Sequence, residues 1–129
     1  MDAFSVLLVD DEVEFLETLV KRLAKRKLQV TGVTSAEEAI RILGDKPVDI
    51  VVLDVKMPGM DGLEALRQIK STSPDVEVIM LTGHANMEAA IQGMELGAFD
   101  YLMKPMDIDE LLYKLQDAYK KKSLRELAR

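Results

Sequence analysis

The chain has 129 residues, 48% of them hydrophobic and 31% charged, which is typical of one globular domain. Its formal net charge of −6 argues against nucleic-acid binding by this domain, and the absence of cysteine excludes disulfides and thiolate metal sites. No apolar run approaches the roughly 20 residues that a membrane-spanning helix needs. Residues 1–3 lack the start of a secretory signal, so we expect a cytoplasmic protein without membrane contact.

The first part of the chain alternates strand and helix patterns. Residues 4–9 are a short apolar run that ends at the acidic cluster Asp10-Asp11-Glu12. Apolar residues then recur at helical spacing up to a basic stretch at 21–27, where cations suit the negative end of a helix dipole. Residues 28–33 predict a second strand. Ser35 followed by Glu38 is a capping box that opens a second helix, and Gly44 is expected to close it.

The most informative stretch covers residues 50–62. Its apolar, β-branched start predicts a strand that is buried on both faces. Its end, with Pro58-Gly59 and Asp61-Gly62, predicts a surface loop. Asp54 lies at the boundary, so its carboxylate would be held by a rigid strand and still face solvent.

The second part of the chain repeats the same alternation. Asp61 with Glu64 caps a third helix, and Asp107 with Glu110 opens a last one. Strands are expected over residues 76–81 and 99–103, with a helix between them at roughly 86–96. We expect one domain over residues 1–120, followed over 121–129 by a basic helical extension or the start of a linker to an output domain.

Five strands alternating with five helices predict an α/β fold, a doubly wound parallel sheet with right-handed crossovers and helices on both faces. The carboxyl ends of parallel strands meet at one edge of the sheet, where ligands bind. Polar residues follow the first, third, fourth and fifth strands at that edge: Asp10, Asp11, Asp54, Thr82 and Lys104.

This set of residues suits phosphoryl transfer. Three close carboxylates repel one another unless a cation balances them, and oxygen-only ligands favour a hard ion such as Mg²⁺. The Lys104 ammonium and the Thr82 hydroxyl suit the oxygens of a transferring phosphoryl group. Aspartate is a known phosphoryl acceptor, so Asp54 is the candidate nucleophile.

Each residue also has a simpler interpretation. Asp10 or Asp11 could cap the first helix, Thr82 could be an ordinary strand-end hydroxyl, and Lys104 a surface lysine. The joint placement at four strand ends favours the functional interpretation. Rival functions lack their residues: a P-loop is absent, and the acidic loop after the first strand would repel the phosphate of a flavin.

The arrangement resembles the receiver domains of bacterial two-component response regulators, over about residues 4–120. The motifs that carry the resemblance are Val9-Asp10-Asp11-Glu12, Leu53-Asp54-Val55-Lys56-Met57-Pro58-Gly59-Met60-Asp61-Gly62, Thr82-Gly83 and Lys104-Pro105. The resemblance implies the flavodoxin-like strand order 2-1-3-4-5. It also implies a cis peptide bond between Lys104 and Pro105.

The resemblance assigns roles at matching positions. Asp54 corresponds to the phosphorylated aspartate, and Lys104 to the lysine that pairs with the phosphoryl group. Asp11, Asp54 and the backbone carbonyl of Lys56 correspond to Mg²⁺ ligands, with Asp10 acting through water. Thr82 and Tyr101 correspond to a switch pair that changes the surface formed by the fourth helix, fifth strand and fifth helix. The side chains of Lys56 and His84 are expected to set the lifetime of the phosphorylated state.

The resemblance also implies partners. A sensor histidine kinase would donate the phosphoryl group from a phosphohistidine. A downstream output domain or effector protein would respond to the phosphorylated state. The domain could also form a homodimer when it is phosphorylated. Residues 82–84 and 96–102 resemble receivers that are attached to ATPase-type transcription activators. Such a domain is no conventional enzyme, because it catalyses only its own phosphorylation and dephosphorylation. The alternative is a pseudo-receiver that acts as an interaction module without phosphorylation.

Overall fold

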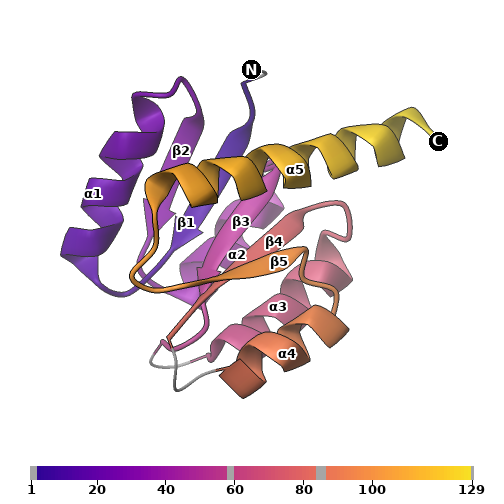
Figure 1. The fold of residues 1–129 in the computed structure, drawn as a ribbon. Helices are drawn as coiled ribbons and strands as arrows, with labels where there is room; N and C mark the ends of the chain where they lie inside the picture. The colour runs from indigo at the N-terminus through magenta and orange to yellow at the C-terminus, as the bar shows by residue number, and fades with distance from the viewer. Residues whose placement is uncertain (1–2, 58–59, 84–86, 129) are drawn as a thin grey trace.

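The computed structural model describes residues 3–57, 60–83 and 87–128, and through them strands alternate with helices (Figure 1). The strands are β1 (Ser5–Val9), β2 (Gln29–Val33), β3 (Ile50–Asp54), β4 (Glu77–Thr82) and β5 (Asp100–Met103). The helices are α1 (Val13–Ala24), α2 (Ala36–Asp45), α3 (Gly62–Thr72), α4 (Met87–Glu95) and α5 (Ile108–Leu127).

The strands form one parallel sheet in the order β2-β1-β3-β4-β5. The predicted α/β class and the flavodoxin-like order are therefore confirmed. The order changes direction between β1 and β3, and the carboxyl ends at such a point form a crevice between the loops that leave in opposite directions. Asp10 directly follows β1 and Asp54 ends β3, so both lie where the strand order changes direction.

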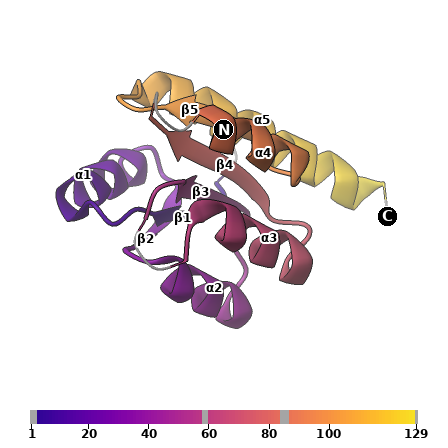
Figure 2. The same ribbon diagram turned by 90° about the horizontal axis from the view of Figure 1, so that it is seen from below.

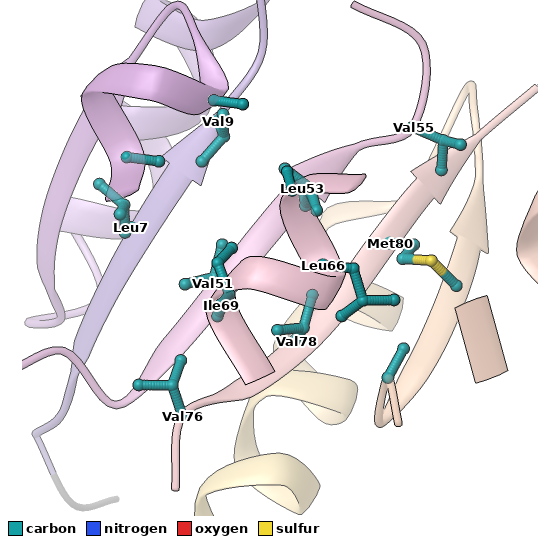
Figure 3. Packing of buried hydrophobic residues seen from close by; sticks show 14 of the residues in the cluster. Leu7, Val9, Val51, Leu53, Val55, Leu66, Ile69, Val76, Val78 and Met80 are labelled. Carbon is teal, nitrogen blue, oxygen red and sulfur yellow. The ribbon is translucent and has the colours of Figure 1, made fainter. Parts of the chain in front are cut away.

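Side chains alternate between the two faces of the sheet, as the pleat requires. Figure 3 shows one face, where Leu53 of β3, Met80 of β4 and Leu66 of α3 belong to one buried cluster. This face packs against α2, α3 and α4, and α2 and α3 lie side by side in Figure 2. The other face, with Ile50 and Leu81, packs against α1 and α5. All residues of β3 are buried, which confirms the prediction for this strand.

The helix starts follow the predicted caps in two of three cases. The Ser35 hydroxyl accepts the backbone N–H of Glu38 at 3.2 Å, and Asp61 accepts that of Glu64 at 2.9 Å. The carboxylate of Asp107 instead accepts the N–H of Asp109 at 2.8 Å, one residue earlier than the predicted box requires. An acceptor on Asp107 can reach either of the first free N–H groups of the helix, so the spacing to Glu110 does not decide which one it takes.

The predicted end of α2 is wrong by one residue. Gly44 lies inside the helix, which continues to Asp45, and the chain leaves the helix at Lys46 with φ −146° and ψ 154°. Lys46 precedes Pro47, and the proline ring disfavours helical backbone in the residue before it. The proline, and not the glycine, therefore ends this helix.

Among the described residues, no helix combines the length and apolar character that a membrane span needs. The longest helix is α5, which runs without a break from Ile108 to Leu127 and crosses in front of the sheet in Figure 1. The basic residues at 120–122 and 125 therefore belong to this helix.

We expect Gly62→Ala to destabilise the fold by about 1–3 kcal/mol, the cost of an added group in a packed site. A Cβ at Gly62 would lie 2.6 Å from Cα and 2.7 Å from the carbonyl oxygen of Val55, and a backbone neighbour cannot rotate away. Urea denaturation of both proteins measures this loss.

Gly44→Ala is the matched control, because its Cβ would meet nothing within 4 Å and the residue lies inside α2. Alanine at this position should stabilise by about 0.5–1 kcal/mol through its helix propensity. Equal effects at Gly62 and Gly44 would contradict the close approach of α3 to the loop after β3.

Candidate functional site

Three of the predicted site residues, Asp10, Asp54 and Lys104, lie together because side chains alternate between the two faces of each strand. Val52 and Leu102 point to the α1 and α5 face, so Asp54, two residues after Val52, and Lys104, two after Leu102, continue on the same side. Val9 pairs with Leu53 in the register of β1 and β3, so the residues that follow them, Asp10 and Asp54, lie side by side. The sheet geometry thus brings residues from three strand ends to one point.

The ammonium of Lys104 joins the acidic groups at this point. Its Nζ lies 2.8 Å from Oδ2 of Asp10, 3.2 Å from Oε1 of Glu12 and 3.6 Å from Oδ2 of Asp54. The Lys104 backbone is held by its N–H, which donates to the carbonyl of Thr82 at 2.8 Å. The predicted cis peptide bond between Lys104 and Pro105 is confirmed. Lys104 is therefore held at both its backbone and its side chain.

Backbone N–H groups orient the two buried carboxylates. Oδ1 of Asp10 accepts the N–H of Glu12 at 2.9 Å, and Oδ1 of Asp54 accepts the N–H of Lys56 at 3.2 Å. Asp10 is 2% exposed and Asp54 6%, so these charges are largely removed from water. In each carboxylate the other oxygen, Oδ2, is the one that faces Lys104.

The environment makes Asp54 an unusual carboxyl group. Burial raises its pKa from the ordinary value of 3.8 to about 6. The N–H of Lys56 and the charge of Lys104 act in the opposite direction, whereas the charges of Asp10 and Asp11 add to the increase. Burial alone would lower the pKa of Lys104, but the hydrogen bond to Asp10 and the charge of Asp54 raise it above its usual value, which keeps the ammonium charged.

The carboxylates form a donor set that fits a hard divalent cation. Among the described residues, Asp10, Glu12 and Asp54 each offer an oxygen within 4.8 Å of the others. Oxygen donors of this kind are those that Mg²⁺ prefers. The ammonium of Lys104 among these oxygens shows that the cluster accommodates positive charge.

Two residues of this region differ from the sequence expectation in their placement. Asp11 is exposed and lies outside the group of three, although its charge contributes to the raised pKa of Asp54. Glu12 had no predicted role, yet it contacts Lys104 and belongs to the donor set. Its place in the run Asp10-Asp11-Glu12 was the only signal for it. Lys56 contributes the N–H bond to Asp54, and its side chain is exposed.

Thr82 and Tyr101 lie on the other face of the sheet from Lys104. Met80 pairs with Tyr101 in the register of β4 and β5, and alternation places Thr82 on the same side as Met80. Thr82 is 1% exposed, and its hydroxyl donates to the carbonyl of Gly83 at 3.2 Å. Tyr101 is half-buried against the core. The predicted switch residues therefore share one face of adjacent strands. His84 lies outside the described residues.

We expect Asp54→Asn to stabilise the metal-free protein by about 2–3 kcal/mol near pH 7.5, at 1.36 kcal/mol for each unit of pKa difference. Below pH 3.8 the carboxyl group of Asp54 is protonated in both the folded and the unfolded chain, so asparagine at this position does not change the free energy of unfolding. Between 3.8 and about 6 the unfolded chain ionises first, and the wild type loses stability as the pH rises. Above about 6 the full cost of the buried charge is present.

Urea denaturation in a chelator, from about pH 4 to about pH 7.5, measures this difference across the range where the two states differ in bound protons. A stability difference that does not grow with pH would contradict the raised pKa.

A five-stranded parallel sheet whose carboxyl edge carries an acidic cluster, a threonine and a lysine before a cis proline is the architecture of a receiver. The family model described as "Response regulator receiver domain" matches residues 6–116 of this chain. The chain belongs to the receiver domain family of bacterial two-component response regulators.

Two curated relatives of this chain are larger proteins. The chain is 40% identical over 113 residues to the DNA-binding transcriptional regulator NtrC of Escherichia coli K12, an alignment that covers 88% of this chain and 24% of NtrC. It is 35% identical over 120 residues to the C4-dicarboxylate transport transcriptional regulatory protein DctD of Rhizobium meliloti, covering 93% of this chain and 26% of DctD. The chain thus spans about a quarter of the length of these relatives.

Solved structures of isolated receivers match over most of their length. A response regulator receiver domain protein from Clostridium thermocellum has a TM-score of 0.89 at 36% identity, covering 92% of this chain and 96% of that one. The receiver domain of NtrX from Brucella abortus has a TM-score of 0.85 at 31% identity, covering 89% and 98%. Both structures therefore share the fold of this chain over nearly its whole length.

Proposed function

We propose that this domain accepts a phosphoryl group on Asp54 and thereby switches a signalling surface. The observation that carries the proposal is the contact of one ammonium, that of Lys104, with Asp10, Glu12 and Asp54 at the carboxyl edge of the sheet. Asp54 is also the one of these carboxyl groups that ends β3, the central strand, whose residues are all buried.

In the proposed step, Oδ2 of ionised Asp54 attacks the phosphorus of a phosphohistidine on a sensor histidine kinase. The new P–O bond forms a mixed anhydride, and the P–N bond to the imidazole breaks. The electron pair of that bond stays on the imidazole nitrogen, which takes up a proton from solvent. Lys104 then exchanges a carboxylate contact for an oxygen of the phosphoryl group, where it balances the negative charge.

Asp10, Asp54 and either Asp11 or Glu12 would hold Mg²⁺, together with the backbone carbonyl of Lys56. The ion would supply charge neutralisation at the acidic cluster and at the transferring phosphoryl oxygens. Support for Asp10, Glu12 and Asp54 is that each offers an oxygen within 4.8 Å of the others, whereas Asp11 and the Lys56 carbonyl are assigned from the family resemblance. Lys56 also fixes one oxygen of Asp54 through its N–H, which leaves Oδ2 as the nucleophile.

Thr82 and Tyr101 are the proposed switch. The hydroxyl of Thr82 would leave the carbonyl of Gly83 for a phosphoryl oxygen, and Tyr101 would turn into the space that is released. Tyr101 lines a groove of about 430 Å³ on β5 and α5, together with Pro105, Met106 and Lys114. A change of the Tyr101 rotamer would alter this groove, so a partner could distinguish the two states.

The partners follow from the family. A histidine kinase would supply the phosphoryl group, and an output domain, an effector protein or a second copy of the chain would respond to it. The named relatives are transcriptional regulators, which supports a role in transcription regulation for the protein that contains this domain. Residues 1–120 would be the receiver and residues 121–129 the extension toward the output domain.

Lys56 and His84 would set the lifetime of the phosphorylated state. The side chain of Lys56 is exposed and two residues from the acceptor, where its bulk and charge would limit in-line attack by water. We expect Lys56→Ala to change the rate of dephosphorylation after removal of the donor, measured by loss of the phosphorylated mass. His84→Ala is the companion variant. Unchanged rates in both variants would exclude these side chains as determinants of lifetime.

Intact mass after incubation with acetyl phosphate and Mg²⁺ tests the proposal. We expect the wild type to gain the mass of one phosphoryl group, and neither Asp54→Asn nor the wild type in a chelator to do so. No gain in the folded wild type would favour an interaction module that works without phosphorylation. A gain in Asp54→Asn would mean that another residue is the acceptor.

A further inference from the structure

Lys104 has a fourth neighbour that is not a carboxylate. Its Nζ lies over the ring of Phe15, 4.6 Å from the ring centroid. Phe15 belongs to the first turn of α1, and Glu12 directly precedes that helix. The beginning of α1 thus contacts the same ammonium with an acidic group and an aromatic face.

We propose that Phe15 is a positioning residue for Lys104. This inference rests on the proposed function, because it assigns Phe15 to the placement of the ammonium that meets the phosphoryl group. The ring holds the ammonium near Asp54 and leaves it free to exchange oxygen partners.

The physical reason lies in what an aromatic ring offers a cation. The ring face attracts the positive charge through its quadrupole and accepts no full hydrogen bond in doing so. An ammonium has three N–H donors, and here two of them serve Asp10 at 2.8 Å and Glu12 at 3.2 Å. A third remains for Asp54 at 3.6 Å or for a phosphoryl oxygen on it. A fourth carboxylate at position 15 would instead compete with the phosphoryl group for these donors.

The ring has a defined position because α1 carries it. Leu16 and Leu19 of the same helix are buried in the core that faces α1 and α5, and Phe15 is half-buried against that core. The ring also lines a groove of about 180 Å³ with Met106 and Ile108, which follow Lys104 in the chain. Phe15 therefore contacts the ammonium and shares a groove with the segment that begins α5.

Phe15→Leu tests the inference, because leucine keeps an apolar side chain of similar bulk and removes the ring face. Phe15→Tyr is the conservative variant, since it keeps the ring. We expect Phe15→Leu to slow phosphorylation by saturating acetyl phosphate about two- to five-fold, the factor that corresponds to one partly exposed cation–π contact. Phe15→Tyr should stay close to the wild type.

A spectroscopic readout separates positioning from packing. The protons on Cε of Lys104 should show an upfield ring-current shift in the wild type and in Phe15→Tyr, and lose it in Phe15→Leu. Val20→Ala is the matched packing control, because Val20 is a partly buried α1 residue of the same core and lies outside the Lys104 contacts. It should lower the melting temperature and leave both the Lys104 shift and the rate unchanged.

A double-mutant cycle completes the test. If Phe15 acts through Lys104, then Phe15→Leu should have no further effect on the rate in a Lys104→Ala background. An equal loss in both backgrounds would overturn the inference, as would a wild-type Lys104 spectrum without the ring-current shift. If the wild type takes up no phosphoryl group, the proposed function fails, and the Lys104 shift still decides whether Phe15 holds the ammonium.

Discussion

Lys104→Ala is expected to slow phosphorylation of Asp54 by acetyl phosphate about a hundred-fold, the usual loss when one group that stabilises a developing charge is removed. The ammonium of Lys104 contacts three carboxylates, and Asp54 is the most distant of the three at 3.6 Å. Without it, Asp10 and Asp54 are buried acids whose common positive neighbour is missing. Their repulsion would disfavour both the ionised nucleophile and the incoming phosphoryl group.

Time courses of intact mass under saturating donor and Mg²⁺ measure this rate. Lys104→Arg is an informative second variant, because it keeps the charge and replaces the compact ammonium by a planar fork, and it should be intermediate. Lys114→Ala is the matched control. Lys114 pairs with Asp100 at 2.5 Å, away from the acidic cluster, and its loss should leave the rate unchanged. A wild-type rate in Lys104→Ala would remove Lys104 from the proposed mechanism.

Glu77→Ala is expected to destabilise the fold by about 2–4 kcal/mol, because it would leave cations around a buried position without their anion. Glu77 is the first residue of β4 and is 1% exposed. It lies at the amino ends of the strands, whereas Asp54 lies at their carboxyl ends. Its carboxylate lies 3.3 Å from Arg125, 3.7 Å from Lys121 and 3.8 Å from Lys70. Arg125 and Lys121 come from α5 and Lys70 from α3, so this residue joins two helices to the sheet.

The same contacts hold the C-terminal half of α5 against the sheet. Lys122 adds an ion pair with Asp49 at 3.0 Å, and the ring of Tyr119 stacks on Phe4 with centroids 4.7 Å apart. Glu77→Ala should therefore raise hydrogen exchange at residues 119–127 more than at residues 108–115.

Urea denaturation and hydrogen exchange measure these two effects of Glu77→Ala. Glu77→Gln should lose less, since the amide keeps the shape and one acceptor. Glu126→Gln, which removes an exposed partner of Lys122, should cost no more than about 0.5 kcal/mol. Equal stability of Glu77→Ala and the wild type would show that the cations are sufficiently hydrated without the carboxylate.

The sequence predicted the parts of this protein that depend on periodicity. The apolar run before Asp54 identified β3, and the positions of polar residues directly after strands correctly predicted that Asp10, Asp54 and Lys104 lie together. These predictions succeed because strand alternation and parallel pairing determine side-chain positions at the ends of a sheet.

The contacts that escaped prediction depend on rotamers and on tertiary packing. Nothing in the pattern of α1 indicated that Glu12 and Phe15 would both reach a lysine about 90 residues away. Glu77 was visible as one acid in an otherwise apolar run, which is a signal that a buried charge needs partners. Its partners Lys121 and Arg125 could not be identified, because the register of α5 against the sheet is a property of the folded core.

The acceptor residue can be identified directly by reducing the phosphorylated protein with borohydride, which converts an acyl phosphate on aspartate to homoserine. After incubation with acetyl phosphate and Mg²⁺, peptide mass spectrometry should find homoserine at position 54 and aspartate at positions 10 and 11. Omission of the donor should leave all three as aspartate. Homoserine at another position, or none in a protein that has gained the mass of a phosphoryl group, would contradict Asp54 as the acceptor.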